Sequence, residues 1–519
     1  MLALRRSTGF VTNSLKRWKS ASPVTIGSNE TIPRVSLDSV NQHVKVAEYA
    51  VRGPIVSKSL EYKQKLQSKS NELPFSEIIE SNIGNPHALR QAPITFMRDV
   101  LSCVVNPSLM DRAPGAFNED VRLRAKKYLD AGNRGVIGMG AYTESRGMVL
   151  VREEISTFLE KRDGFAANID NIFVTNGASA GVSLCMNTLI QPGDGILTPI
   201  PQYPLYSAAT ALYDANLIPY YLDESAGWAA SVDKLQEGLD SARSSAIATK
   251  ALVVINPGNP TGQVMKEEDM ISVINFCVRE NLVLMADEVY QENIYKEGAQ
   301  FHSFRKVAKE MGVLDLNSGK DENATGLQLI SFHSISKGFL GECGLRGGYF
   351  ELYGFPKSVI DEIYKLASTG LCSNTIGQIA TGLMVNPPVE GDASFDQYKN
   401  EKDAILSSLH RRATKSTIKL NELPGIECQE IEGALYAFPT IHLPPKAVEY
   451  AQAHGMAPDA FYCEKLLDNT GIVVVPGSGF KQVEGTFHFR TTILPPEEQL
   501  DRYFTLLGDF HSKFMQEYS

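Results

Sequence analysis

The chain has 519 residues, of which 43% are hydrophobic and 21% are charged, and its formal net charge is −10. At about 150 residues per domain this length allows two to four globular domains. The acidic balance excludes nucleic-acid binding driven by overall charge, and the sequence contains no apolar run of about 18 residues that could cross a membrane. We therefore expect neither nucleic acid nor a membrane among its partners.

The first 29 residues differ from the rest in composition. They contain no Asp or Glu, whereas Arg, Lys, Ser and Thr recur among isolated apolar residues. This composition is typical of a mitochondrial transit peptide, which we place at residues 1–25, and the lack of a continuous apolar stretch disfavours a secretory signal. The alternative is a basic tail without a targeting role, which would leave the protein in the cytoplasm.

The central third of the chain alternates short apolar runs with helical patterns. Residues 34–66 before it are expected to be extended chain and then helix, and Glu77–Asn82 a short strand. The alternation is typical of βαβ units in a mostly parallel sheet, so the expected fold class is α/β. Six strands are expected: Ile172–Thr175, Gly195–Thr198, Ala251–Asn256, Leu282–Ala286, Leu327–Phe332 and Gly347–Leu352. The polar segment Asn317–Gly326 is expected to be a surface insertion.

The pattern changes after Val385. The break at Asn386–Pro388 leads into a long charged helix around Tyr398–Leu420, followed by strands near Gly433–Pro439 and Gly471–Pro476. These features indicate a second, smaller domain. The expected organisation is an N-terminal arm with part of the small domain (26–130), a large domain (131–385) and a C-terminal small domain (386–519).

The scattered cysteines and histidines do not suggest a disulfide framework or a metal site. The seven cysteines form no C-x-x-C pair, and the nine histidines show no H-E-x-x-H spacing. An odd set of cysteines without metal-ligand spacing favours reduced thiols. We expect no structural metal.

Polar clusters follow several expected strands, where the reactive groups of open α/β sheets collect. Asn176–Ser179 turns from a strand into a helix, whose N-terminus can bind phosphate, although a turn of small residues alone is weak evidence. Tyr203 follows the second strand and can stack on an aromatic ring or belong to the core. The Pro- and Gly-rich segment Asn256–Gly262 can present the Asn259 amide in a defined place, or be only a turn.

Asp287 ends an apolar strand in the sequence Asp287-Glu288-Val289-Tyr290. A carboxylate at the end of a buried strand is costly unless a positive group pairs with it. A protonated pyridine nitrogen is such a group, and Tyr290 could then reach the ring hydroxyl. The alternative is a helix N-cap.

The strongest motif is Ser334-Ile335-Ser336-Lys337, with Arg346 a few residues on. The lysine amine can form a Schiff base if its pKa is lowered, and the hydroxyls and guanidinium can hold a phosphate. A surface lysine after a serine turn is the alternative. Arg490 lies in an apolar stretch and needs an anion, which can be a substrate carboxylate or an internal salt-bridge partner.

The order of these motifs resembles that of the fold-type-I aminotransferases of class I/II. The motifs are N-G-A-S, P-x-Y-P, N-P-x-N-P-T-G, D-E-V-Y, S-x-S-K and F-R-T, and they extend from about Asn82 to the C-terminus. Their joint occurrence is far more specific than any one of them. The segments Ile83–Pro86, Gly140–Thr143, Asn256–Gly262 and Phe339–Tyr349 are most similar to the alanine aminotransferases in this family.

The resemblance implies that the large domain binds pyridoxal 5′-phosphate (PLP) and that Lys337 is catalytic and holds the cofactor as a Schiff base. Asp287 would contact the pyridine nitrogen, Asn259 and Tyr290 the ring oxygen, and Tyr203 the ring face. The residues implied to hold the phosphate are Ala178, Ser179, Ser334, Ser336 and Arg346. Arg346 is slightly farther from the lysine than in aspartate aminotransferases, which leaves its own contact open.

The resemblance also implies substrate contacts and a partner. Arg490 would bind the substrate carboxylate with help from the backbone near Gly84. Tyr142 would reach the phosphate bound by the neighbouring subunit, because in this family the active site lies at the interface of a homodimer.

The implied reaction is a ping-pong transfer from L-alanine to 2-oxoglutarate, giving pyruvate and L-glutamate, with Lys337 moving the α-proton. Glutamate:glyoxylate aminotransferase shares every cofactor residue and is the main rival, ahead of 1-aminocyclopropane-carboxylate synthase and cysteine-conjugate lyase. A catalytically silent binding or regulatory protein of the same fold is the alternative of a different class. Such regulators carry a winged-helix domain before this fold, whereas here a short basic leader and an arm precede it.

Overall fold

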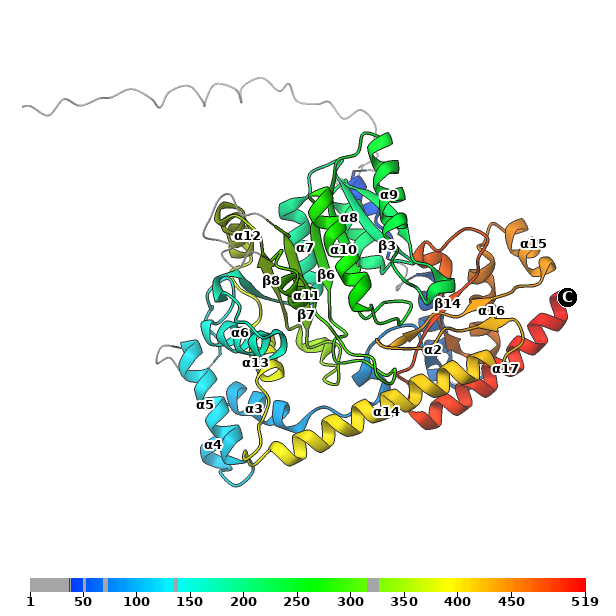
Figure 1. Ribbon diagram of the computed structural model, residues 1–519. Coiled ribbons are helices and arrows are strands. Elements are labelled where there is room, and N and C mark those ends of the chain that lie inside the picture. Colours follow the sequence, from blue (N-terminus) through cyan, green and yellow to red (C-terminus); the bar gives the residue numbers. More distant parts are fainter. Residues whose placement is uncertain (1–36, 38, 50–52, 69–72, 134–138, 315–325) are drawn as a thin grey trace, which may run out of the picture.

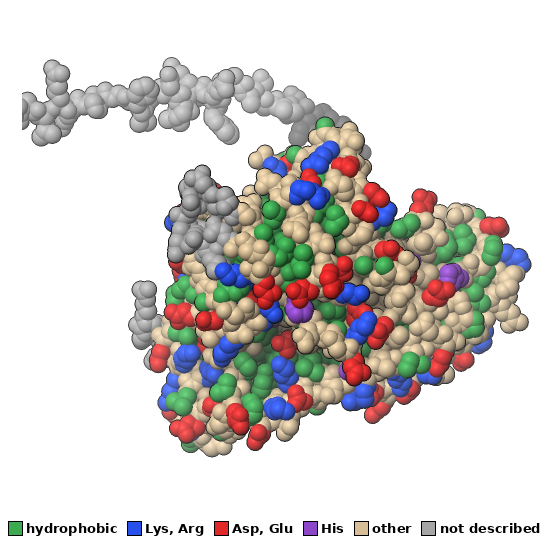
Figure 2. All heavy atoms as spheres, in the orientation of Figure 1, with side chains coloured by type: hydrophobic (Ala, Val, Ile, Leu, Met, Phe, Trp, Pro, Cys, Tyr) green, Lys and Arg blue, Asp and Glu red, His purple; other side chains and the backbone are tan. Residues whose placement is uncertain are grey.

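The computed structural model describes residues 37, 39–49, 53–68, 73–133, 139–314 and 326–519 (Figure 1). The predicted transit peptide lies outside the described residues, and so does the predicted surface insertion except for its last residue. Every helix within the described ranges is too short or too polar to span a bilayer. Acidic and basic side chains are interspersed over the face shown in Figure 2, so this face offers no large field of one sign.

A seven-stranded sheet forms the centre of the molecule, with the order β2-β8-β7-β6-β5-β3-β4. Only β8 runs antiparallel to its neighbours, so the predicted mostly parallel sheet is confirmed. The strands are β2 (Ile172–Thr175), β3 (Gly195–Ile200), β4 (Asn216–Tyr221), β5 (Thr249–Ile255), β6 (Val283–Asp287), β7 (Leu329–Ser334) and β8 (Gly348–Tyr353). All six predicted strands are present with slightly displaced ends, and β4 is additional. β4 escaped prediction because Pro219 interrupts its pattern, which an edge strand tolerates.

Helices cover both faces of the sheet. Ala251 and Val253 of β5 pack toward α7 (Ala178–Leu189), α8 (Pro204–Leu212) and α12 (Lys357–Thr369), whereas Leu252 and Val254 pack toward α9 (Val232–Ser244), α10 (Glu267–Glu280) and α11 (Phe304–Glu310). Because successive side chains point to opposite faces, a strand that is buried on both sides is apolar throughout. This explains the continuous apolar runs in the sequence.

A further group of helices packs beside β2 and β8. It consists of α3 (Thr95–Val105), α4 (Leu109–Arg112), α5 (Glu119–Asn133), α6 (Val149–Asp163) and α13 (Thr375–Val385). The described residues between 94 and 128 therefore share a core with helices of the large domain.

The C-terminal part forms a separate core of helices on short strands. Its helices are α14 (Phe395–Asn421), α15 (Pro445–Ala453), α16 (Pro458–Thr470) and α17 (Glu497–Tyr518), and α14 and α17 lie side by side in Figure 1. Its strands are β9 (Ile426–Glu427), β10 (Tyr436–Ala437), β11 (Thr440–Ile441), β12 (Ile472–Val473), β13 (Val475–Pro476) and β14 (Phe489–Thr492). The predicted long helix and small α+β unit are present. β14, which carries Arg490, was not among the predicted strands.

The N-terminal segment contacts both parts. β1 (Ile79–Glu80) pairs in parallel with β12, and Lys58 on α2 (Pro54–Gln67) forms salt bridges with Glu464 and Asp468 on α16. α1 (Gln42–Val46) lies against α8 of the large domain. The segment thus places residues that follow it, Gly84 among them, between the two parts.

Candidate active site

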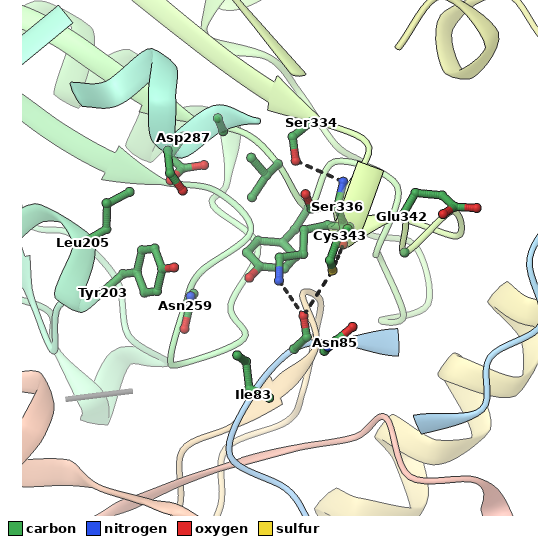
Figure 3. Close-up of a pocket in the computed structure, with 18 of the residues that line it drawn as sticks. Ile83, Asn85, Tyr203, Leu205, Asn259, Asp287, Ser334, Ser336, Glu342 and Cys343 are labelled. Carbon is green, nitrogen blue, oxygen red and sulfur yellow. Dashed lines mark hydrogen bonds between the residues drawn. The ribbon is translucent and has the colours of Figure 1, made fainter. Parts of the chain in front are cut away.

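A cavity of about 680 Å³ lies where the carboxyl ends of β5, β6 and β7 face the small domain (Figure 3). Asp287, Tyr203 and Asn259 line one side of the view, and Ser334, Ser336 and Cys343 line the other. The predicted site residues that line it are Gly84, Ala178, Ser179, Tyr203, Asn259, Asp287, Tyr290, Ser334, Ser336, Lys337, Arg346 and Arg490. Tyr142 does not line it, and 75% of this residue is exposed.

Lys337 reaches into the cavity directly after β7. Its Nζ donates a hydrogen bond of 2.8 Å to the carbonyl oxygen of Gly84 and lies 5.7 Å from the ring centre of Tyr290. A Cβ at position 84 would overlap the hydroxyl of Tyr436 and lie 3.1 Å from the lysine nitrogen. Only glycine therefore allows the backbone to approach the amine this closely.

Asp287 is the last residue of β6 and is 5% exposed. Its Oδ2 accepts a 3.0 Å hydrogen bond from the hydroxyl of Tyr206, while its Oδ1 has no partner among the described residues. Burial raises the pKa of Asp287 from 3.8 to about 6, against the opposing effects of Tyr206, the Val289 backbone N–H and the charge of Lys337. A buried carboxyl with one free oxygen is suited to a cationic partner.

An anion-binding corner lies at the start of α7. Gly177, its N-cap, has φ +81° and no side chain to occupy the free N–H groups of the first turn. The Arg346 guanidinium donates to the backbone oxygens of Cys343 at 2.7 Å and Asn176 at 3.0 Å, and lies 3.5 Å from Ser336 Oγ. Ser334 Oγ accepts from the Ser336 N–H at 3.1 Å. Arginine, hydroxyls and a helix N-terminus together can hold a phosphate.

Arg490 on β14 is a buried cation at the opposite side of the site and is 1% exposed. It donates to Asn259 Oδ1 at 3.1 Å and to the backbone oxygen of Asn82, and its guanidinium lies 4.3 Å from the ring centre of Tyr436. No acidic side chain pairs with it in the described part of the chain, and its Nε has no partner there. Such a group is suited to a carboxylate ligand.

Tyrosines complete the lining. The hydroxyl of Tyr203 lies 2.9 Å from that of Tyr49, and the rings of Tyr290 and Tyr436 meet edge to face at 6.2 Å. Burial and the neighbouring Tyr436 raise the pKa of Tyr290. The pKa of Tyr436 is lowered although burial alone would raise it, because the charges of Lys337 and Arg490 favour its phenolate.

Two functional candidates were not predicted from the sequence. Tyr206 lies in the first turn of α8, three residues after the extended N-cap Tyr203, and its sequence context does not distinguish it from a core tyrosine. Tyr436 lies in the apolar strand β10, where nothing distinguishes it from a core tyrosine. It belongs to the site only because the small domain folds over the sheet.

The donor set fits PLP. The cavity offers an amine for an aldehyde, a buried carboxyl oxygen without a partner for a ring nitrogen, aromatic faces for a flat ring and a cationic corner for a phosphate. These are the four chemical features of the cofactor.

The chain is similar to known aminotransferases over most of its length. The family model described as aminotransferase class I and II matches residues 120–505. Alanine aminotransferase 2 of Panicum miliaceum is 50% identical over 489 residues, which cover 93% of this chain and 99% of that protein. The mitochondrial alanine aminotransferase 1 of Arabidopsis thaliana is 50% identical over 496 residues, covering 95% and 89%. Glutamate–glyoxylate aminotransferase 1 of Arabidopsis thaliana is 46% identical over 484 residues, covering 93% and 96%.

Solved structures agree on the fold. An alanine aminotransferase from Pyrococcus furiosus matches with a TM-score of 0.70 at 24% identity, covering 91% of this chain and 99% of that one. An aminotransferase from Escherichia coli matches with a TM-score of 0.69 at 23% identity, covering 92% and 98%. The α/β fold of this family, expected from the motifs, is confirmed.

Proposed function

The chain belongs to the aminotransferase class I and II family, and from this premise we propose that it is a PLP-dependent alanine aminotransferase. It transfers the amino group of L-alanine to 2-oxoglutarate in two half-reactions, giving pyruvate and L-glutamate. The observation that carries the proposal is the 50% identity to proteins named alanine aminotransferase over nearly their whole length.

Lys337 carries the proton chemistry in this proposal. When bound, PLP supplies the aldehyde that takes up the amino group and the ring that accepts the electron pair of the α-carbon. The Nζ of Lys337 would hold the cofactor through its aldehyde and, when free, would act as the general base for the α-proton and as the general acid that returns it. Its hydrogen bond to the Gly84 carbonyl keeps the amine at one place in the cavity.

The other residues hold the reacting groups in position. Asp287 would hold the ring nitrogen with its Oδ1, which has no partner among the described residues, and Asn259 and Tyr290 would hold the ring oxygen. Arg490 binds the α-carboxylate of the amino acid or of the 2-oxo acid, which supplies a counter-ion that the buried guanidinium does not find among the described residues.

The remaining predicted residues complete the cofactor site. Tyr203 would cover the ring face, and the phosphate would be held at the corner formed by Ala178, Ser179, Ser334, Ser336 and Arg346, all of which line the cavity. The large exposure of Tyr142 supports a homodimer in which this side chain reaches the partner's phosphate.

A panel of donors and acceptors tests the substrate assignment. With purified protein and glutamate as the common donor, the proposal predicts a higher kcat/KM for pyruvate than for glyoxylate or oxaloacetate as acceptor. The 46% identity to glutamate–glyoxylate aminotransferase makes that reaction the second candidate. A higher kcat/KM for glutamate with glyoxylate would replace the first assignment by the second.

We also propose that the protein acts in the mitochondrial matrix. The acid-free leader supports this, and so do the similar chains from Arabidopsis thaliana and Dictyostelium discoideum that are named mitochondrial. Residues 1–29 fused to a fluorescent protein should direct it into mitochondria, whereas a fusion that stays in the cytosol would contradict the proposal.

A further inference from the structure

Tyr206 contacts Asp287 but is not among the residues that line the cavity. It lies on α8, has no exposed surface and packs in the core between this helix and the sheet. Its hydroxyl donates a 3.0 Å hydrogen bond to Oδ2 of Asp287, whose other oxygen has no partner among the described residues. The two carboxylate oxygens are therefore in different environments.

We propose that Tyr206 is a positioning residue for Asp287: its hydroxyl holds one carboxylate oxygen so that the acid stays ionised and its other oxygen faces the PLP ring nitrogen. This inference rests on the proposed function, because it takes PLP as the ligand. Tyr206 itself touches neither cofactor nor substrate in this arrangement.

The direction of the hydrogen bond follows from the acidities of the two groups. Burial and the nearby Asp287 raise the pKa of Tyr206 well above its usual range, so the phenol keeps its proton and donates. For Asp287, burial favours the neutral acid, and Tyr206 is foremost among the groups that oppose this effect, ahead of the Val289 N–H and the charge of Lys337. Hydrogen bonds to a carboxylate stabilise its charged form.

The remaining titratable neighbours do not supply a substitute donor. Cys185 and Tyr203 lie near Tyr206. Tyr290 lies near Asp287 and lines the cavity. Burial raises the pKa of the Cys185 thiol, so it stays neutral and is a weak donor. Removal of the Tyr206 hydroxyl therefore leaves Asp287 with the backbone N–H and the more distant lysine.

Tyr206→Phe tests the inference, with Tyr220→Phe as the matched control. Tyr220 belongs to the core on the other face of the sheet, is 1% exposed and donates a 2.8 Å hydrogen bond to the Val253 carbonyl. Both changes remove one buried hydroxyl and keep the ring. Only the hydroxyl of Tyr206 contacts the Asp287 carboxylate, whereas that of Tyr220 contacts a backbone carbonyl.

The primary readout is the ¹⁵N NMR shift of the ring nitrogen in holoenzyme loaded with ring-labelled PLP, and the second is the dissociation constant of PLP. In Tyr206→Phe the shift should move toward the unprotonated ring, and PLP should bind roughly ten- to a hundredfold more weakly, the range for a hydrogen bond to a charged group. kcat should fall with little change in the KM for alanine, because Arg490 is untouched. Tyr220→Phe should keep all these values.

A double variant separates positioning from general packing. In an Asp287→Asn background, Tyr206→Phe should weaken PLP binding little further, because its effect passes through the carboxylate. An unchanged ¹⁵N shift in Tyr206→Phe, or an equal further loss in the Asp287→Asn background, would overturn the inference alone. A wild-type protein that takes up no PLP would instead contradict the proposed function on which it rests.

Discussion

The residues of the site carry charges that are unfavourable until a ligand meets them. Asp287 is buried with one oxygen unpartnered among the described residues, and Arg490 is buried with no acidic partner among them. Burying an unpaired charge costs free energy, so these two residues lower the free energy of unfolding of the cofactor-free protein. A bound ligand that pairs with these charges removes this cost, so PLP binding should raise the free energy of unfolding.

This cost predicts a stabilising variant. Because the pKa of Asp287 is raised from 3.8 to about 6, the folded protein holds this proton more tightly than the unfolded chain. Its contribution to stability is therefore fully present below the unfolded pKa and is lost as the pH rises through about 6. Asp287→Asn removes that loss and should stabilise the cofactor-free protein at pH 8 by about 3 kcal/mol.

Urea unfolding of cofactor-free wild type and Asp287→Asn at pH 5 and pH 8 measures this effect. The gain should be smaller at pH 5, where the wild-type acid is mostly protonated, and the variant should bind PLP more weakly at both pH values. A variant that is no more stable than wild type at pH 8 would contradict the assigned burial cost.

A second residue-scale prediction concerns Arg490. Its two hydrogen bonds, to Asn259 and to the Asn82 backbone, fix a planar group that Lys cannot replace. Arg490→Lys should raise the KM for alanine on the order of a hundredfold while PLP affinity changes little, since truncating a buried charge pair costs several kcal/mol. Steady-state kinetics and a PLP titration check this, and an unchanged KM would place the substrate carboxylate elsewhere.

At this scale the sequence predicted the residues whose chemistry is unusual for their position. Lys337, Asp287 and Arg490 are charged groups in or next to apolar strands. The sequence analysis predicted a cofactor or substrate contact for each of them, and all three line the cavity. Tyr206 and Tyr436 could not be separated from ordinary core tyrosines, because only tertiary packing brings them beside Asp287 and Lys337.

At the scale of elements, strand ends and helix starts supply most of the site. Asp287 and Ser334 are the last residues of β6 and β7, and the first turn of α7 provides the anion corner. The apolar runs of the buried strands made these elements predictable. β4 and β14 were not predicted, because Pro219 breaks the pattern of β4, and β14 is a four-residue strand that pairs with the two-residue strands β10 and β13.

Two glycines test the anion corner. Gly177 has φ +81° and a Cβ there would overlap the Arg346 guanidinium, whereas Gly193 has φ +87° and open space around it. Alanine at either position costs about 1–3 kcal/mol of backbone strain. Only Gly177→Ala should also weaken PLP binding, by roughly tenfold or more, as one charge-assisted contact is displaced.

Thermal unfolding and PLP titrations of both variants distinguish strain from a lost contact. Similar losses of stability with an effect on PLP confined to Gly177→Ala support the assignment. Equal PLP affinities in the two variants would show that the phosphate does not lie beside Arg346.

At the scale of the whole molecule, the predicted site residue Tyr142 is separate from the cavity of its own chain. It is largely exposed, so its side chain is free to contact the second subunit of the proposed homodimer. The sequence could suggest this arrangement only through resemblance, since one chain carries no direct signal of its partner. A symmetric dimer would bring the side chain to the partner's anion corner.

Hybrid dimers test this directly. Tyr142→Phe alone should bind PLP more weakly, and Lys337→Ala alone should be inactive. In a dimer of one Tyr142→Phe chain and one Lys337→Ala chain, the site with the intact lysine receives an intact Tyr142 from its partner. That site should regain wild-type PLP affinity, whereas a site that keeps the low affinity of the Tyr142→Phe homodimer would show that the tyrosine acts within its own chain.

The identity of the lysine that binds PLP covalently tests the proposed active site most directly. Borohydride reduction of the PLP-loaded protein, followed by proteolysis and mass spectrometry, identifies the lysine that carries the cofactor. The wild-type protein should carry one phosphopyridoxyl group, on Lys337, and Lys337→Ala should carry none. A label on another lysine, or no label on wild type, would contradict the proposed active site.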